Sequence, residues 1–412
     1  MHNKSAIPSA YSLPPPSALF AEWPLRPDVV HLDHGSAGGC PRRVMADQQD
    51  IAGKIEQGPH EWFAKEYAFR IKAAKVALAD FLNADVTGLA LLPGTTHGLN
   101  VACLSHSFQH GDELLTTDHA YSSTTKILEH VAQKYGARVV VARVPFPVES
   151  PDQLLDSIMS YVSAKTKFAV IDHIPSRTGL VFPIRRIVAE LNTRGIDTLV
   201  DGAHAPGHVQ VDLRSIDASY YVASCHKWMC TPRGVGFIYV RKDKLPTVSP
   251  VIIARSCYYR DNNPSLRTRL EHDFDWMGTY DPSAYLSLPS TIAFLESICP
   301  NGHAGLVRRN HNLALQARRI ISRELGIPAA CPDDMVGSMV AVPLPDSVGP
   351  EYPQGTLPLQ KRLFEEARIE VQVYNFPQYP KRLLRFSIQA HNSFEQIEYL
   401  AHHLKVALAE EK

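Results

Sequence analysis

Short apolar runs alternate with stretches of helical periodicity through about the first 285 residues of the chain. Most of these runs are continuously apolar, a pattern typical of strands buried on both faces of a sheet. Alternation of such strands with helices predicts an α/β domain built on a mainly parallel sheet. Seven runs predict its strands: 88–92, 113–117, 138–142, 168–172, 198–201, 218–223 and 235–240.

The pattern changes after these strands, where a predicted helix at 286–296 leads out of the domain. The following segment combines helices with three strand-like runs, which predicts a smaller α+β C-terminal domain. The runs are 338–343, 369–374 and 383–388. Residues 1–30 are rich in proline and irregular. We therefore expect an N-terminal arm at 1–30, a large domain at 31–285 and a small domain at 286–412.

Composition excludes several classes of protein. The 412 residues carry 42 Lys+Arg and 42 Asp+Glu, so no net charge attracts the chain to nucleic acid or to an anionic membrane. No apolar run approaches the roughly 20 residues of a membrane helix, and no signal pattern opens the chain. Seven scattered cysteines lack metal-site spacing, so we expect reduced thiols, no metal site and a cytoplasmic enzyme.

A single lysine stands among small, hydroxyl and imidazole side chains in Ser224-Cys225-His226-Lys227-Trp228. The motif follows a predicted strand, and loops at strand carboxyl ends carry the chemistry in such sheets. A crowded, partly desolvated site lowers the pKa of a lysine, so that Lys227 can form an imine with an aldehyde. Taken alone, Lys227 is more typical of a solvated lysine that starts a helix.

A carboxylate follows another predicted strand, in Asp201-Gly202-Ala203-His204. Asp201 can pair with a pyridinium N–H and keep that nitrogen protonated. His204 can reach a ring oxygen or a substrate carboxylate. The alternatives are a helix N-cap for Asp201 and a structural role for His204. Together, amine and carboxylate predict a pyridoxal phosphate site.

Phosphate donors are expected at Gly94-Thr95-Thr96, which follows a strand-like run and opens a helix. Backbone N–H groups at a helix start and a threonine hydroxyl form an anion cradle. Ser224 and His226 can add donors, although Gly-Thr-Thr by itself is also an ordinary N-cap.

Two further side chains are candidates for the same site. Tyr121 follows a strand and can stack on a pyridine ring, with His119 as the competing residue. Arg385 is flanked by apolar residues and needs an anionic partner. That partner is a substrate α-carboxylate or, equally, the carboxylate of a buried salt bridge.

Taken in order along about 30–395, these motifs resemble the class V aminotransferase family of fold-type I pyridoxal phosphate enzymes. Within it the chain is most similar to the isopenicillin N epimerase-like branch. The resemblance is carried by Leu32-Asp33-His34-Gly35-Ser36, Gly94-Thr95-Thr96, Asp172-His173-Ile174-Pro175-Ser176-Arg177-Thr178-Gly179, Asp201-Gly202-Ala203-His204, Ser224-Cys225-His226-Lys227, Trp276-Met277-Gly278-Thr279 and Arg385-Phe386-Ser387.

The resemblance implies a role for each matching residue. It implies that Lys227 forms the imine, Asp201 meets the ring nitrogen, and His204 and Ser176 lie near the phenolic oxygen. Phosphate is assigned to Thr95, Thr96, Ser224 and His226. Gly278 and Thr279 are expected to reach the cofactor phosphate of the second subunit in a homodimer. Substrate contacts are expected from His34, Tyr374 and Arg385.

The chain departs from the family pattern at two positions, which bear on the reaction and on the substrate. Cysteine desulfurases of the family carry a nucleophilic cysteine in the loop that corresponds to 374–380, where this chain has none. Desulfuration at that position is therefore not expected. Asp33 stands where an asparagine is usual, which leaves the choice of substrate open.

The expected reaction begins with an external aldimine and removal of the Cα proton by Lys227. Epimerase-like or lyase-like chemistry, including C–S β-elimination, is favoured over an aminotransferase or a cyclase. Epimerisation needs an acid opposite Lys227, and its candidates are His34, Tyr121, Tyr374 and Tyr379. Arg255, Arg260, Arg267 and Arg269 form either a distal carboxylate site or a solvated loop. A non-catalytic regulator that binds the cofactor is the alternative from another class of protein.

Overall fold

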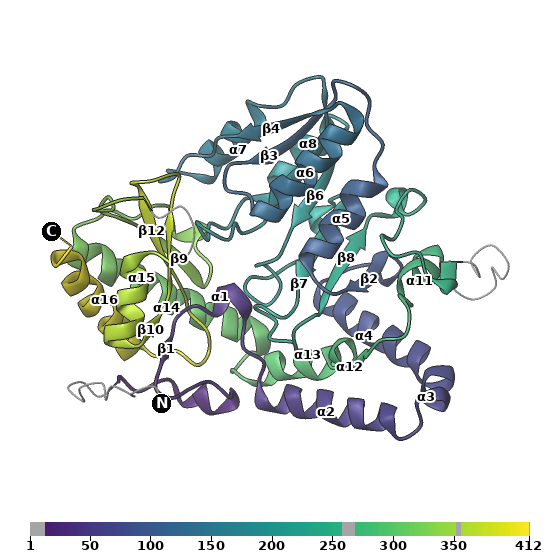
Figure 1. The fold of residues 1–412 in the computed structure, drawn as a ribbon, viewed down its shortest axis with the longest axis horizontal. Helices are drawn as coiled ribbons and strands as arrows, with labels where there is room; N and C mark the ends of the chain where they lie inside the picture. The colour runs from purple at the N-terminus through teal and green to yellow at the C-terminus, as the bar shows by residue number, and fades with distance from the viewer. Residues whose placement is uncertain (1–12, 258–267, 352–355, 412) are drawn as a thin grey trace.

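The computed structural model describes residues 13–257, 268–351 and 356–411 and contains the seven predicted strands. They form one sheet in the order β2-β8-β7-β6-β5-β3-β4 (Figure 1). β8 alone runs opposite to the other six strands, so the mainly parallel α/β prediction is confirmed. The strands are β2 (Leu89–Leu92), β3 (Glu113–Thr117), β4 (Arg138–Ala142), β5 (Thr166–Asp172), β6 (Asp197–Asp201), β7 (Tyr220–Ser224) and β8 (Gly236–Val240).

Helices cover both faces of the sheet, which explains why its strands are continuously apolar. Neighbouring residues of one strand enter different cores: Leu114 packs with α5 and α6, and Leu115 packs in the core that contains α4 and α8. The helices of this part are α2 (Arg42–Glu56), α3 (Pro59–Lys65), α4 (Tyr67–Phe81), α5 (Thr95–Ser105), α6 (Ser122–Tyr135), α7 (Pro151–Met159), α8 (Ile184–Thr193), α9 (Leu213–Ile216), α11 (Arg269–Phe274) and α12 (Ser283–Leu286).

The C-terminal part is an antiparallel sheet in the order β11-β12-β9, packed against helices (Figure 1). Its strands are β9 (Met339–Leu344), β11 (Gln372–Asn375) and β12 (Arg382–Ser387). Its helices are α14 (Gly302–Leu325), α15 (Pro358–Ala367) and α16 (Phe394–Ala409), and α13 (Leu288–Ser297) leads into it. No helix in the described ranges is long and apolar enough to cross a membrane.

One predicted strand, 369–374, is divided in the structure. Its first part, β10 (Ile369–Glu370), pairs in parallel with β1 (Val30–His31), and only the second part joins β12. The side chains of Val30 and Leu32 consequently lie in the core of the C-terminal part. The short helix α1 (His34–Ala37) follows β1 and thus begins where the two parts of the chain meet.

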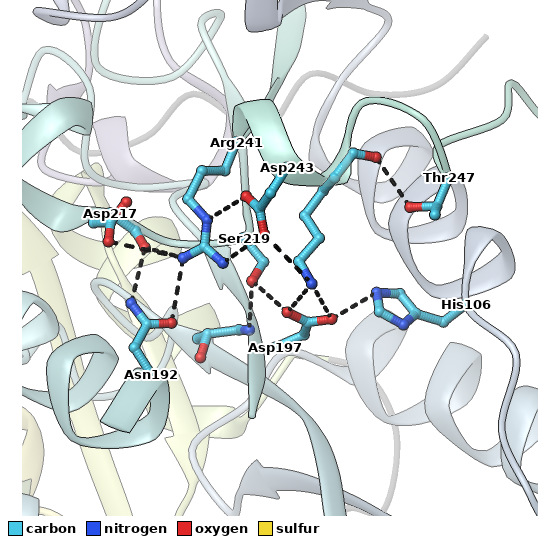
Figure 2. Close-up of polar contacts among 10 residues, drawn as sticks. His106, Asn192, Asp197, Asp217, Ser219, Arg241, Asp243 and Thr247 are labelled. Carbon is cyan, nitrogen blue, oxygen red and sulfur yellow. Dashed lines mark hydrogen bonds and ion pairs between the residues drawn. The ribbon is translucent and has the colours of Figure 1, made fainter. Parts of the chain in front are cut away.

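Ion pairs hold the amino-terminal edge of the large sheet (Figure 2). Asp197, the first residue of β6, pairs with Lys244 at 2.6 Å and accepts a hydrogen bond from Ser219 at 2.9 Å. Arg241 binds the carbonyl of Asp217 at 2.9 Å beside this group. The carboxylate at the start of β6 is therefore neutralised locally, in contrast to Asp201 at the end of the same strand.

Candidate active site

A cavity of about 410 Å³ opens at the carboxyl ends of the parallel strands. This is the position at which α/β sheets bind their ligands. The cavity brings together predicted residues from five separate segments of the chain. The predicted residues that line it are Thr95, Thr96, Tyr121, Ser176, Asp201, His204, Ser224, His226 and Lys227.

Lys227 lies in the loop 225–235 between β7 and β8. Burial lowers the pKa of its amine to about 8, against the opposing effect of the Asp201 carboxylate. The backbone of Gly38 packs directly against this loop. Gly38 adopts a φ of +69°, and a side chain at this position would collide with the backbone carbonyl of His226, so only glycine allows the close contact. The amine is therefore held in place, and burial brings its pKa closer to neutral pH.

The imidazole of His204 lies against the amine of Lys227. Its Nε2 lies 3.1 Å from Lys227 Nζ, and Trp228 Nε1 donates to its Nδ1 at 3.4 Å. Burial lowers the pKa of His204 well below its usual value, so the ring is neutral. Because Nδ1 accepts, the ring proton is on Nε2 and donates to the lysine nitrogen. A neutral amine can accept this hydrogen bond, so the contact acts in the same direction as the lowered pKa of Lys227.

Asp201 ends β6 with its carboxylate in the cavity. Its Oδ1 accepts from the backbone of Ala203 at 2.9 Å, and its Oδ2 is 3.5 Å from the hydroxyl of Thr124. Asp172 occupies the same register on the neighbouring strand β5, and its Oδ2 has no partner among the described residues. Burial raises the pKa of both carboxyls, and the charge of Asp201 adds to the rise at Asp172.

Sequence reasoning did not assign Asp172 to the site, although the residue lines the cavity. The available indication was that Asp172 ends an apolar run in the same way as Asp201. His97 and Ser36 also line the cavity without having been predicted.

The amino terminus of α5 forms one end of the cavity. Ser224 Oγ accepts from the backbone N–H of Thr95 at 3.1 Å and lies 2.8 Å from its hydroxyl. Nearby, the buried Nδ1 of His226 has no partner among the described residues. A side chain at Gly236 would meet Gly94 Cα at 2.6 Å, so the strand and the helix start approach closely. Hydroxyl, imidazole and helix N–H donors here suit a phosphate.

Tyr121 and His119, the two candidates for ring stacking, have different surroundings. Tyr121 precedes α6, lines the cavity and is half-exposed. His119 is buried, 3.0 Å from the Thr178 hydroxyl and 3.2 Å from the Val144 carbonyl, and does not line the cavity. Of the two, only Tyr121 is placed to meet a ring in the cavity.

Arg385 projects from β12 and binds Ser176, Asp33 and Ser36 at the cavity edge. Its Nη1 donates to the Ser176 carbonyl at 2.7 Å, and its Nη2 pairs with Asp33 at 2.7 Å. The guanidinium carbon also lies 5.4 Å from the centre of the Tyr374 ring. The structure therefore contains the predicted buried salt bridge, and it places this pair next to the serines that line the cavity.

Several predicted residues lie away from the cavity. His34 contacts the Lys227 carbonyl at 3.1 Å from behind the loop, and Tyr379 donates to the Gly349 carbonyl. Arg269 lies 3.4 Å from Asp273 and also donates to the Val248 carbonyl at 3.3 Å. The other residues outside the cavity lining are Tyr374, Arg255, Gly278 and Thr279. Arg260 and Arg267 lie outside the described residues.

The cavity fits pyridoxal phosphate by the chemistry of its donors. Lys227 offers an amine for the aldehyde, Asp201 a carboxylate for the ring nitrogen, and the start of α5 donors for the phosphate. The unpartnered atoms of His226 and Asp172 both belong to residues that line this space. Among the described residues, no group of three or more His, Cys, Asp and Glu side chains is suited to hold a metal ion.

The family model and the similar proteins place the chain in the same family. The Aminotransferase class-V family model matches residues 30–342. Isopenicillin N epimerase of Amycolatopsis lactamdurans is 31% identical over 392 residues, which cover 92% of this chain and 96% of the relative. A probable chloroplastic L-cysteine desulfhydrase of Arabidopsis thaliana is 28% identical over 85% of this chain and 76% of its own length.

Solved structures show the same fold at lower identity. A cysteine desulfurase from Thermococcus onnurineus superimposes with a TM-score of 0.77 at 18% identity, over 99% of this chain and all of its own. A cystine C–S lyase gives a TM-score of 0.73 at 20% identity, over 92% of this chain and 98% of its own. This similarity establishes the architecture.

Proposed function

Because the chain belongs to the class V aminotransferase family, whose cofactor is pyridoxal phosphate, we propose that it removes the Cα proton of an α-amino acid and then epimerises or β-eliminates it. The observation that carries this proposal is the 3.1 Å contact between Lys227 Nζ and the neutral His204 ring. A hydrogen bond donated by His204 can be accepted only by the neutral amine, the form that cofactor capture and proton removal both require.

The cofactor, when bound, withdraws electrons from Cα and so makes its proton acidic. The protein supplies the remaining functions. Asp201 keeps the ring nitrogen protonated, and Thr95, Ser224 and His226 hold the phosphate. Lys227 Nζ accepts the proton from Cα and, in the epimerase and lyase reactions alike, is the base on its face of the site.

Epimerisation further requires an acid on the face opposite Lys227. Of the four candidates, Tyr121 is the one that lines the cavity. His34 lies behind the lysine loop and Tyr379 is bonded elsewhere. We therefore propose the Tyr121 hydroxyl as the opposite acid if the product is an epimer.

Desulfuration is not part of the proposed activity. The loop at 374–380 lacks a cysteine, and none of the chain's seven cysteines lines the cavity. Cys225 and Cys230 are buried, and burial raises the pKa of both thiols, so that neither is a ready nucleophile. The likeness to solved desulfurases concerns the fold alone.

We also propose a cytoplasmic homodimer. The cavity lining contains no arginine among the described residues, so a dianionic phosphate meets mostly neutral donors within one chain. Thr279 is exposed outside its own cavity, which suits a contact with the second subunit. The seven cysteines form no disulfide, in keeping with a reducing compartment.

The test is a panel of L-amino acids incubated with the holoenzyme in heavy water. Acidic, sulfur-containing and hydroxylated members are followed for deuterium at Cα, chirality, ammonia and keto acid. Deuterium uptake with loss of chirality identifies an epimerase. Pyruvate, ammonia and sulfide from L-cysteine identify a C–S lyase, whereas alanine with persulfide identifies a desulfurase. Absence of exchange and of product across the panel would refute the proposed enzyme.

A further inference from the structure

Arg385 and Asp33 form a buried ion pair at the edge of the cavity. The two side chains are 1% and 6% exposed, and Arg385 Nη2 lies 2.7 Å from Asp33 Oδ1. Arg385 comes from β12 and Asp33 from the turn between β1 and α1, so the pair joins residues distant in sequence. The carboxylate is therefore a fixed part of the arginine's surroundings.

The remaining donors of Arg385 are largely occupied. Nη1 donates to the Ser176 carbonyl at 2.7 Å and approaches its hydroxyl at 3.2 Å, and Nη2 also contacts the Ser36 hydroxyl. Only Nε has no partner among the described residues. A carboxylate that binds an arginine with both oxygens needs two neighbouring N–H groups. Such a ligand must therefore displace an acceptor that the protein already provides.

Asp33 has other donors that can keep it in place after displacement. Its Oδ2 accepts from Gln372 Nε2 at 2.6 Å, and its Oδ1 accepts from the Ser36 hydroxyl at 2.7 Å. Ser36 and Ser176 both line the cavity and both contact Arg385. A carboxylate that enters from the cavity thus reaches Arg385 beside a second carboxylate, where like charges repel strongly because the surroundings are dry.

We propose that Asp33 is a specificity-determining residue, an internal counter-ion that competes with the substrate carboxylate for Arg385. This inference rests on the proposed function, in which Arg385 receives the α-carboxylate of an amino acid. Exchange of one ion pair for another yields little net binding. The site therefore discriminates against small amino acids and selects those whose distal part contributes further contacts.

The experiment measures binding to the holoenzyme rather than turnover. L-alanine and L-alaninamide, which lacks the carboxylate, are titrated separately while the absorbance of the bound cofactor is followed. The informative quantity is the dissociation constant of the amide divided by that of the acid. In Asp33→Asn this ratio should rise at least about tenfold over wild type, because a like charge is removed from the site. An unchanged or smaller ratio would overturn the inference.

The variant Arg385→Gln tests whether Arg385 binds the substrate carboxylate, independently of the role of Asp33. If Arg385 binds the carboxylate, this variant lowers the ratio, and if it does not, the ratio stays unchanged. A lowered ratio in Arg385→Gln with no rise in Asp33→Asn rejects the role of Asp33 alone. Cofactor content and melting temperature verify that each variant is folded.

A structure of the wild-type holoenzyme with L-alanine gives an independent measurement if Asp33→Asn does not fold. The inference predicts that the Asp33 carboxylate has left Arg385 and retains Gln372. A bound carboxylate on Arg385 with the Asp33 contact intact would contradict it.

Discussion

Asp172 and Asp201 stand in the same register at the ends of neighbouring parallel strands, so that two buried carboxyls share one side of the cavity. Burial raises the pKa of both, and at Asp172 the charge of Asp201 adds to this effect. Two carboxyls so close together in a dry site do not both ionise at neutral pH. We assign the proton to Asp172, because Asp201 accepts the hydrogen bonds of Ala203 and Thr124.

This assignment predicts opposite results for two isosteric variants. Asp201→Asn should lower the rate of Cα deuterium exchange by about 100-fold, since a charge-assisted contact to the ring nitrogen is lost. Asp172→Asn should stay within about threefold of wild type, because an amide replaces a neutral acid. Exchange rates in heavy water measure both. A larger loss in Asp172→Asn than in Asp201→Asn would reverse the assignment.

The difference in stability between Asp172→Asn and the wild-type protein should depend on pH, because only the wild type has a carboxyl at this position. A carboxyl whose pKa is raised in the folded state contributes stability below its ordinary pKa of 3.8, and this contribution is lost as pH rises toward the folded-state pKa. The variant should therefore gain stability relative to wild type between pH 5 and pH 8. Urea unfolding of the apoprotein at several pH values measures the difference. A difference that does not vary with pH would show that Asp172 is ionised in the folded protein.

Cofactor capture by the apoprotein should accelerate as pH rises, with a midpoint close to the Lys227 pKa of about 8. The physical reason is that only the neutral amine attacks the aldehyde. Stopped-flow absorbance between pH 6.5 and 9.5 gives the profile. Asp201→Asn should shift the midpoint to lower pH, because the Asp201 carboxylate raises the pKa of Lys227. A rate that still rises without levelling off at pH 9.5, as the ordinary lysine pKa of 10.5 would produce, would mean that the amine is not desolvated.

Tyr121 should contribute to cofactor affinity through its ring. Tyr121→Ala should weaken cofactor binding by about tenfold, the value of one aromatic contact, while Tyr121→Phe retains affinity. Equilibrium dialysis of the reconstituted variants measures this. In an epimerase, Tyr121→Phe would instead slow the appearance of the D-isomer without slowing deuterium exchange from the L-isomer. Normal affinity in Tyr121→Ala would remove the ring from the cofactor site.

The dimer can be tested by complementation between subunits. Gly278 adopts a φ of +112°, so Gly278→Val should distort the segment that is proposed to reach the second subunit. Mixed with Lys227→Ala, it should restore about a quarter of wild-type activity, because half of the dimers carry one complete site of two. Each variant incubated alone is the control. Mass spectrometry verifies that mixed dimers have formed. If these dimers recover no activity, Gly278 acts at the site of its own subunit.

Continuous apolar runs were sufficient to predict the strands of the large sheet, because both of its faces are buried. Lys227 and Asp201 were predictable for a related reason, since polar residues that end such runs meet at one edge of the sheet. The division of 369–374 was not, because only the pairing of β10 with β1 separates the two halves. The Asp33–Arg385 contact likewise depends on packing between β12 and the turn after β1, which no local pattern records.

The central claim is that Lys227 binds pyridoxal phosphate through an imine, and borohydride reduction tests it most directly. The reconstituted protein is reduced, digested and mapped by mass spectrometry, with Lys227→Arg as the matched control. We expect the reduced cofactor on the peptide that contains Lys227 and no labelled peptide in the control. A colourless, unlabelled wild-type protein after saturation with cofactor, or label on another lysine, would contradict the account.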